Sequence, residues 1–176
     1  MFLQKIKNIT IIILCASFIT SCNQSISYKR PQILTNFGSF ECDTKKLANN
    51  QYGDIWDKVR SGFCLDIVHS SRVDKEIMWF QNNKDFLYRS IDRARPFLYH
   101  VLLELEKNNL PFELALLPIV ESGYQPYAYS PSKAAGIWQF IPPTAREYGL
   151  KKNWWYDGRR DIFASTKAAS HFLRDM

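Results

Sequence analysis

The sequence lacks the patterns that β-sheet domains and metal sites require. Alternating apolar and polar residues and Asn-Gly turn pairs are missing, which excludes a domain built from β-hairpins. No CxxC pair occurs, and the three histidines are scattered along the chain, so we expect no metal site. Internal repeats and low-complexity tracts are missing as well. These absences favour an all-α fold and a site that needs no cofactor.

A dense basic cluster is also missing. Lysine and arginine exceed the acidic residues by 23 to 17, for a formal net charge of +6. Between residues 72 and 95, however, the basic residues alternate with acidic ones, which is typical of a solvated helix face. Aromatic residues do not interleave a basic run there, as they would on a nucleic-acid-binding surface. We therefore expect no nucleic acid partner.

Residues 1–21 resemble a bacterial lipoprotein signal peptide. Lys5 and Lys7 precede a short apolar run over residues 9–19, and small residues lead to Cys22. The run is too short to span a bilayer, which needs about 20 apolar residues. Cleavage before Cys22 and lipidation of its sulfur would anchor the mature protein; an ordinary secretory signal is the alternative. Asn23 is compatible with transport to the outer membrane, so we expect a lipid-anchored protein of the bacterial cell envelope facing the periplasm.

Residues 22–50 read as a linker between the anchor and a folded domain. They are rich in Ser, Asn, Gln and Lys and show little periodicity. With Cys15 in the leader and Cys22 as the lipid site, Cys42 and Cys64 are the pair left for a disulfide in an oxidising periplasm. Two thiols without a bridge are the favoured alternative, because sequence cannot show that the two Cα atoms lie within bonding range.

Helical periodicity begins at residue 51. Short helices are expected around Trp56 and Ile77, and apolar residues at three- and four-residue spacing predict a long helix over residues 86–105. Pro96 should kink that helix. Farther on, residues 142–149 should form a short helix that opens at two prolines and closes at a glycine. Asp161 is the expected N-cap of a final helix.

Glu121 is the candidate reacting group. Pro111 suits the first turn of a helix and Gly123 suits the residue just past its end, which places Glu121 in a last helical turn. The carbonyl end of a helix and the apolar residues 114–120 both disfavour an anion. Such a site favours the protonated acid and tunes a glutamate to donate a proton. Pro118 should bend this segment or restart it, and a solvated acid at a loop entrance is the structural alternative.

The loop after Glu121 has the composition of a sugar-binding surface. Aromatic, small and amide side chains follow one another there: Tyr124, Tyr127, Tyr129, Ala134, Ala135, Gly136, Trp138 and Gln139. Aromatic faces beside amide groups can stack on sugar rings and hydrogen-bond their hydroxyl or acetamido groups. The same spacing is equally typical of core residues.

A second aromatic run follows at residues 154–156. We expect Trp154, Trp155 and Tyr156 to pack under the domain, with added stacking surface in the groove as the alternative. Arg159 and Arg160 are expected to pair with local acidic residues.

Three segments together resemble the lytic transglycosylases of the membrane-bound murein transglycosylase D type. They read ELALLPIVES, SPSKAAGIWQFIPPTAREYGL and YDGRRDIFASTKAASHFL, in the order and spacing of that family. The resemblance extends back through WDKVRSGF and RARPFLYHVLLELEKNNLP, and so covers residues 52–176. It implies a lysozyme-like, all-α catalytic domain.

The resemblance also implies a reaction and a set of site residues. The MurNAc-GlcNAc β-1,4 bond of peptidoglycan strands would be cleaved without water during cell-wall turnover, as the muramic 6-hydroxyl attacks its own anomeric carbon and leaves a 1,6-anhydro end. Glu121 would act first as acid and then as base, and Asp157 and Asp161 need not be catalytic. Ser122 would orient Glu121 or contact the acetamido group. The full set of expected substrate-binding residues is Ser122, Tyr124, Gly136, Ile137, Trp138 and Gln139.

The sequence departs from the family at its C-terminus. Family members continue past the helix that matches residues 161–176, through an Asn-Ala-Gly element, whereas this sequence stops at Met176. We therefore expect an N-terminal helical region over residues 51–109, followed by the N-terminal part of the catalytic domain over residues 110–176. The alternative to an enzyme is a non-catalytic peptidoglycan-binding lipoprotein or an inactive truncated remnant.

Overall fold

The computed structural model describes residues 53–176, so the predicted signal peptide, Cys22 and the linker lie outside the described residues. Within this part the chain is helical, and its β-structure consists of isolated bridges. The all-α prediction is thus confirmed. The elements are α2 (Ile55–Ser61), α3 (Ser71–Asn82), α4 (Lys84–Lys107), the 3-10 helix η4 (Phe112–Leu116), α5 (Leu117–Ser122), α6 (Pro142–Glu147) and α7 (Ile162–Asp175).

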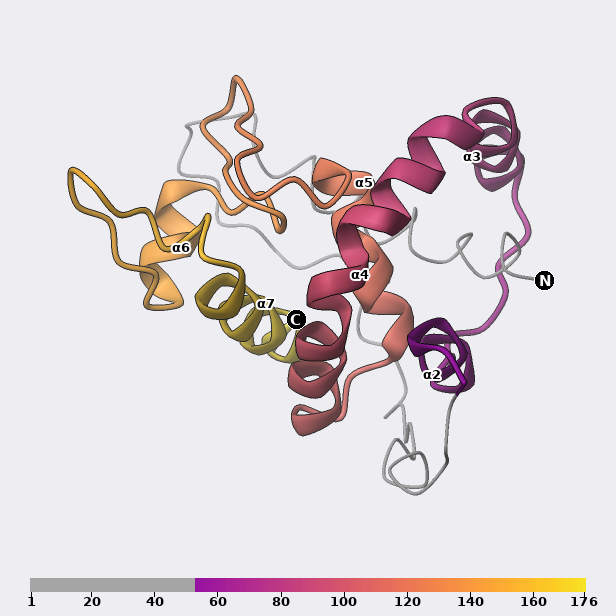
Figure 1. The fold of residues 1–176 in the computed structure, drawn as a ribbon, viewed down its shortest axis with the longest axis horizontal. Coiled ribbons are helices and arrows are strands. Elements are labelled where there is room, and N and C mark those ends of the chain that lie inside the picture. Colours follow the sequence, from indigo (N-terminus) through magenta and orange to yellow (C-terminus); the bar gives the residue numbers. More distant parts are fainter. Residues whose placement is uncertain (1–52) are drawn as a thin grey trace, which may run out of the picture.

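The long helix α4 is the element against which most others pack. It contacts α2, α3, η4, α5 and α7, and it crosses the middle of the molecule in Figure 1. Its predicted apolar stripe is the core, since Leu98, Val101, Leu102 and Leu105 have exposed fractions of 0%. Burying each such side chain contributes about 1.5–3 kcal/mol. The helix continues through Pro96, and the kink expected there stays a prediction.

A smaller apolar cluster lies between α6 and α7. Phe140, Ala145, Leu150, Ala168 and Ala169 form it. The side chain of Trp138 packs against both this cluster and the main core. Trp138 therefore joins the α6–α7 side of the molecule, on the left of Figure 1, to the α4 core.

Local capping signals in the sequence were read correctly. Helix α6 begins at Pro142 and is followed by Gly149, whose φ of 76° is in the left-handed region. At the start of α7, the carboxylate of Asp161 accepts a hydrogen bond from the Ala164 amide at 3.0 Å. This is the predicted N-cap, which supplies an acceptor for a backbone donor that the helix leaves unpaired.

The expectation for Cys64 was wrong. The sequence favoured thiols, whereas Cys64 is disulfide-bonded, and its partner lies outside the described residues. As for the membrane, none of the helices over residues 53–176 combines the length and the apolar character needed to cross a bilayer.

Candidate active site

Glu121 lies in a helix that restarts at a proline. The 3-10 helix η4 ends at Leu116, and α5 begins at Leu117 with Pro118 in its first turn. A proline is tolerated there because the first turn of a helix does not use its N–H groups. The restart is one of the two outcomes expected from Pro118. Glu121 is the penultimate residue of α5, in its last turn, as predicted.

The surroundings of Glu121 favour its protonated form. The side chain is half-buried, and desolvation by burial raises the pKa of its carboxyl above the usual range. Its place at the carbonyl end of α5 acts in the same direction, because the aligned peptide dipoles put partial negative charge there. A raised pKa lets a carboxyl keep its proton to a higher pH, as a general acid requires.

The turn after Glu121 is pressed against α4. Gly123 has a φ of 58° and Tyr124 a φ of 57°, so two successive residues are left-handed. Arg93 Nη1 donates to the Gly123 carbonyl oxygen at 3.3 Å. A Cβ on Gly123 would lie 3.1 Å from Ser90 Oγ, which is a tight contact. Helix α4 thus sets where α5 ends, and with it the position of Glu121.

Tyr124 corrects a second expectation. It was expected to contact substrate, but its side chain has an exposed fraction of 0%. Its hydroxyl donates to the Ala115 carbonyl oxygen at 2.6 Å, and burial raises the pKa of that hydroxyl. Tyr124 therefore fixes the turn from inside the core and is closed off from any ligand.

Ser122 ties α5 to the loop that follows it. Its hydroxyl lies 3.0 Å from the Ile137 carbonyl oxygen and 3.1 Å from that of Pro118, and it donates toward both. Ile137 itself has an exposed fraction of 1%. Gly136 is buried as well, and a part for these two residues in substrate binding stays a prediction.

Gln139 and Trp138 remain partly open to solvent. Gln139 has a left-handed φ of 49°, and its Nε2 donates to the Gly136 carbonyl oxygen at 2.7 Å. Trp138 Nε1 donates to Thr166 Oγ1 at 3.0 Å. Their polar groups hold the loop in place, and both side chains are half-buried. Substrate contacts by these two residues stay a prediction.

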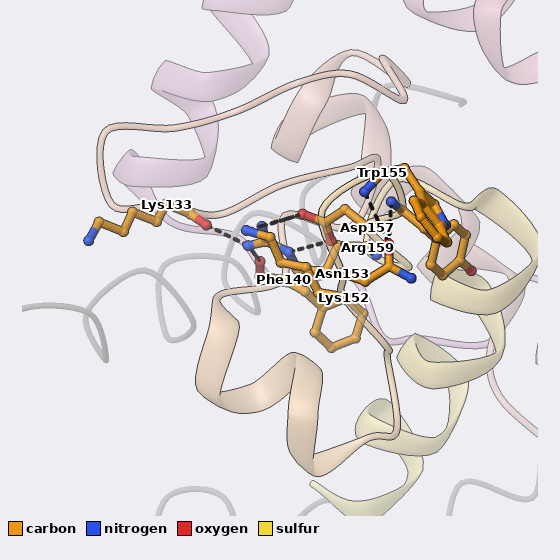
Figure 2. Close-up of polar contacts among 8 residues, drawn as sticks. Lys133, Phe140, Lys152, Asn153, Trp155, Asp157 and Arg159 are labelled. Carbon is orange, nitrogen blue, oxygen red and sulfur yellow. Dashed lines mark hydrogen bonds and ion pairs between the residues drawn. The ribbon is translucent and has the colours of Figure 1, made fainter.

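Arg159 is a buried structural residue, and its role in joining the loop to the turn was not apparent from the sequence. Only 2% of it is exposed, and its Nε and Nη2 donate to Asp157 at 2.9 and 2.6 Å. Its Nη1 donates to the carbonyl oxygens of Lys133 and Phe140 at 2.6 and 3.2 Å, as Figure 2 shows. The expected pairing with a local acid is confirmed for Arg159, whereas the Arg160 guanidinium lies over the Tyr129 ring, 5.9 Å from its centroid. Arg159 hydrogen bonds hold the Asp157 pKa below its usual range.

The second aromatic run corrects a third expectation. Trp154, Trp155 and Tyr156 were expected to pack under the domain, but their exposed fractions are 86%, 71% and 37%. With Tyr127 and Tyr129 they line a pocket of about 500 Å³, which we call the aromatic pocket. Glu121 is not among its lining residues. The pocket lies between the loop that follows α5 and the turn over residues 151–158.

Comparison with known proteins shows which family and which relatives this chain resembles. Residues 103–176 match the family described as the transglycosylase SLT domain. The chain is 42% identical over 122 residues to membrane-bound lytic murein transglycosylase D of Escherichia coli strain K12, a match that covers 69% of this chain and 27% of that protein. It is 47% identical over 81 residues to the "Putative tributyltin chloride resistance protein" of Alteromonas sp. strain M-1, covering 46% of this chain and 39% of that protein. The chain thus spans well under half the length of either relative.

Proposed function

We propose that this protein is a lytic transglycosylase that acts on peptidoglycan, because residues 103–176 match the transglycosylase SLT domain family. The observation that carries the proposal is the setting of Glu121. It is a half-buried carboxyl whose pKa is raised by burial, in the last turn of α5. The identity to a lytic murein transglycosylase of Escherichia coli supports the same activity and substrate.

The proposed reaction uses Glu121 twice. Its carboxyl proton goes to the glycosidic oxygen between N-acetylmuramic acid and N-acetylglucosamine as the bond from that oxygen to the muramic C1 breaks. The muramic 6-hydroxyl then bonds to C1, and its proton returns to the Glu121 carboxylate. No water is consumed, and the product ends in 1,6-anhydromuramic acid. General acid-base catalysis of this kind contributes about 10²–10⁴-fold to a rate.

One carboxyl suffices for this reaction. Two-acid glycosidases need a second carboxylate as nucleophile or base, but here the substrate's own hydroxyl takes that part. The two aspartates at the start of α7 and just before it have structural partners. Asp157 accepts two hydrogen bonds from the Arg159 guanidinium, and Asp161 caps α7. Their structural use is consistent with a mechanism that needs Glu121 alone.

The other proposed elements complete this assignment. Half-buried Gln139 and Trp138 would contact the sugar, and Ser122 would hold α5 against the loop so that Glu121 faces the glycosidic oxygen. We also propose lipidation at Cys22 and an outer-membrane location facing the periplasm, on the sequence of the leader alone. A lipid anchor would keep the site close to the murein that it cleaves.

The test is a digest of purified sacculi followed by mass spectrometry of the products. We expect 1,6-anhydromuramyl products from the wild-type chain, and a loss of at least about 100-fold with Glu121→Gln. Glu147→Gln, an exposed glutamate on α6, is the matched control and should leave the rate unchanged. Products with reducing ends would identify a hydrolase. Binding to sacculi without any products would identify a non-catalytic wall-binding protein.

A further inference from the structure

The aromatic pocket is lined by aromatic rings that are largely exposed to solvent. Tyr127, Trp154 and Trp155 have exposed fractions of 81%, 86% and 71%, and Tyr129 has one of 55%. Large aromatic rings are usually buried for most of their area, and a cluster of exposed rings marks an interaction site. The pocket volume of about 500 Å³ lies within the range of small-ligand sites, about 300–1,000 Å³.

The turn that carries the two tryptophans is held by its own hydrogen bonds. Asn153 Oδ1 accepts from the amides of Trp155 and Tyr156 at 3.1 and 2.8 Å, and the Asn153 amide donates to the Tyr156 carbonyl oxygen at 2.8 Å. Figure 2 shows Asn153 and Trp155 side by side in this turn. The rings of Trp154 and Trp155 meet edge to face with their centroids 4.6 Å apart. Rings held in this way lose little conformational freedom when a ligand binds.

The turn is also braced against the loop that follows Glu121. Arg159 pairs with Asp157 at the base of the turn and donates to the carbonyl oxygens of Lys133 and Phe140 in the loop. Both segments project on the side of the molecule away from α2 and α3 in Figure 1. Two residues of the aromatic pocket, Tyr127 and Tyr129, therefore belong to the loop that begins directly after Glu121 and its helix.

The chemistry of the pocket matches an amino-sugar chain. Ring faces are offered beside side chains of both charges and an amide, since Lys152, Asn153, Asp157 and Arg160 also line it. Flat apolar sugar faces stack on such rings, while hydroxyl and acetamido groups need both donors and acceptors. A membrane-inserting tip is the competing reading for exposed tryptophans next to lysines. Carboxylates within a concave surface argue against it, because acidic groups are repelled by anionic lipid.

We propose that the aromatic pocket is a second glycan-binding subsite, which holds a stretch of β-1,4-linked N-acetylated amino sugars away from the bond being cleaved. The proposal rests on the proposed function, because it takes the same polymer as ligand. In this arrangement the pocket retains the strand while Glu121 acts on another part of it.

The test measures binding by the full chain carrying Glu121→Gln, so that cleavage does not intervene. The probe is the β-1,4-linked hexamer of N-acetylglucosamine, titrated calorimetrically. Adding Trp154→Ala and Trp155→Ala together should weaken binding about ten-fold, as expected for the loss of two stacked rings. Tyr99→Ala, which removes a ring of 64% exposed fraction on α4, is the control and should leave the affinity unchanged. Thermal unfolding of each variant checks that the fold is retained.

Three results would overturn the proposal. The first is that the Glu121→Gln parent shows no measurable hexamer binding. The second is that the parent and the double-tryptophan variant bind the hexamer with equal affinity. The third is that the double-tryptophan variant loses binding to anionic phospholipid vesicles but keeps its affinity for the hexamer. A failure of the proposed function looks different, because wild-type protein would then yield no anhydro products whether or not the tryptophans bind sugar. Cleavage with tryptophan-independent hexamer binding would refute the subsite alone.

Discussion

The carbonyl oxygen of Arg159 lies directly against Gly136, so close that a Cβ on Gly136 would stand 1.7 Å from it. Gly136 also has a φ of 82°, in the left-handed region that glycine adopts without strain. The loop after α5 and the segment that enters α7 therefore touch backbone to backbone at this point. The contact places the Ile137 carbonyl oxygen, to which Ser122 donates, and so it supports the end of α5 that bears Glu121.

Gly136→Ala should destabilise the fold strongly. The added methyl group cannot fit beside the Arg159 carbonyl, so we expect a loss of about 3 kcal/mol or more in the free energy of unfolding, together with a loss of activity. Gly149→Ala is the matched control, because Gly149 has a similar φ of 76° but no atom within 4 Å of the added Cβ. It should cost only about 1–2 kcal/mol. Equal losses in urea titrations of the two variants would show that backbone strain, and not the contact, is responsible.

Asp157→Asn should destabilise the fold, because it leaves the buried Arg159 guanidinium without its carboxylate partner. Arg159 is 2% exposed, so removal of its carboxylate partner should destabilise the fold by about 3 kcal/mol. The Asp57→Asn control breaks an exposed pair with Arg60, in which the Asp57 side chain is 48% exposed, and should cost below about 1 kcal/mol.

The Asp157–Arg159 pair also predicts a loss of folding stability at low pH. Arg159 lowers the pKa of Asp157, so the pair stabilises the fold above the usual aspartate pKa of about 3.9 and this stability is lost as the pH falls through the lower folded-state value. The melting temperature of the wild type should therefore approach that of Asp157→Asn as the pH falls below the usual aspartate pKa. A gap between the two that stays constant from pH 7 to pH 2 would contradict this assignment.

Glu121→Gln should become more stable than the wild type as the pH rises. Burial raises the pKa of Glu121 in the folded state, so its protonated form supplies stability below the unfolded-state pKa, and that stability is lost as the pH rises through the folded-state value. Glutamine cannot ionise, so the two melting temperatures should be similar near pH 4 and separate toward pH 8. A catalytic rate that falls as the pH rises through the folded-state pKa would fit the same carboxyl acting as the acid.

Tyr124→Phe should affect stability and leave substrate affinity unchanged. The lost hydroxyl donates to the Ala115 carbonyl oxygen at 2.6 Å in a fully buried setting, so we expect destabilisation of about 1–3 kcal/mol. The KM for sacculi should not change, because the ring does not reach the surface. Tyr88→Phe, at a tyrosine of 61% exposed fraction on α4, should change neither quantity. An increase in KM without loss of stability would restore Tyr124 as a binding residue.

Local signals predicted the helices and the place of Glu121 within them. The restart at Pro118, the end of α5 at Gly123 and the cap at Asp161 all depend on a residue and its immediate neighbours. Backbone hydrogen bonds and dihedral preferences act over a few residues, so sequence is enough to read them. The apolar stripe of α4 was readable for the same reason, since helical spacing places those side chains on one face.

Tertiary structure decided which aromatic residues are buried and which are exposed. Tyr124 and Trp154 both lie in loops with aromatic neighbours, yet one is 0% and the other 86% exposed. The difference comes from contacts that each residue or its turn makes outside its own loop. Tyr124 turns inward on a left-handed backbone and finds the Ala115 carbonyl, whereas the turn of Trp154 is braced outward by Arg159 through Lys133 and Phe140. Which rings are buried depends on contacts between residues far apart in the chain, and no local pattern encodes those contacts.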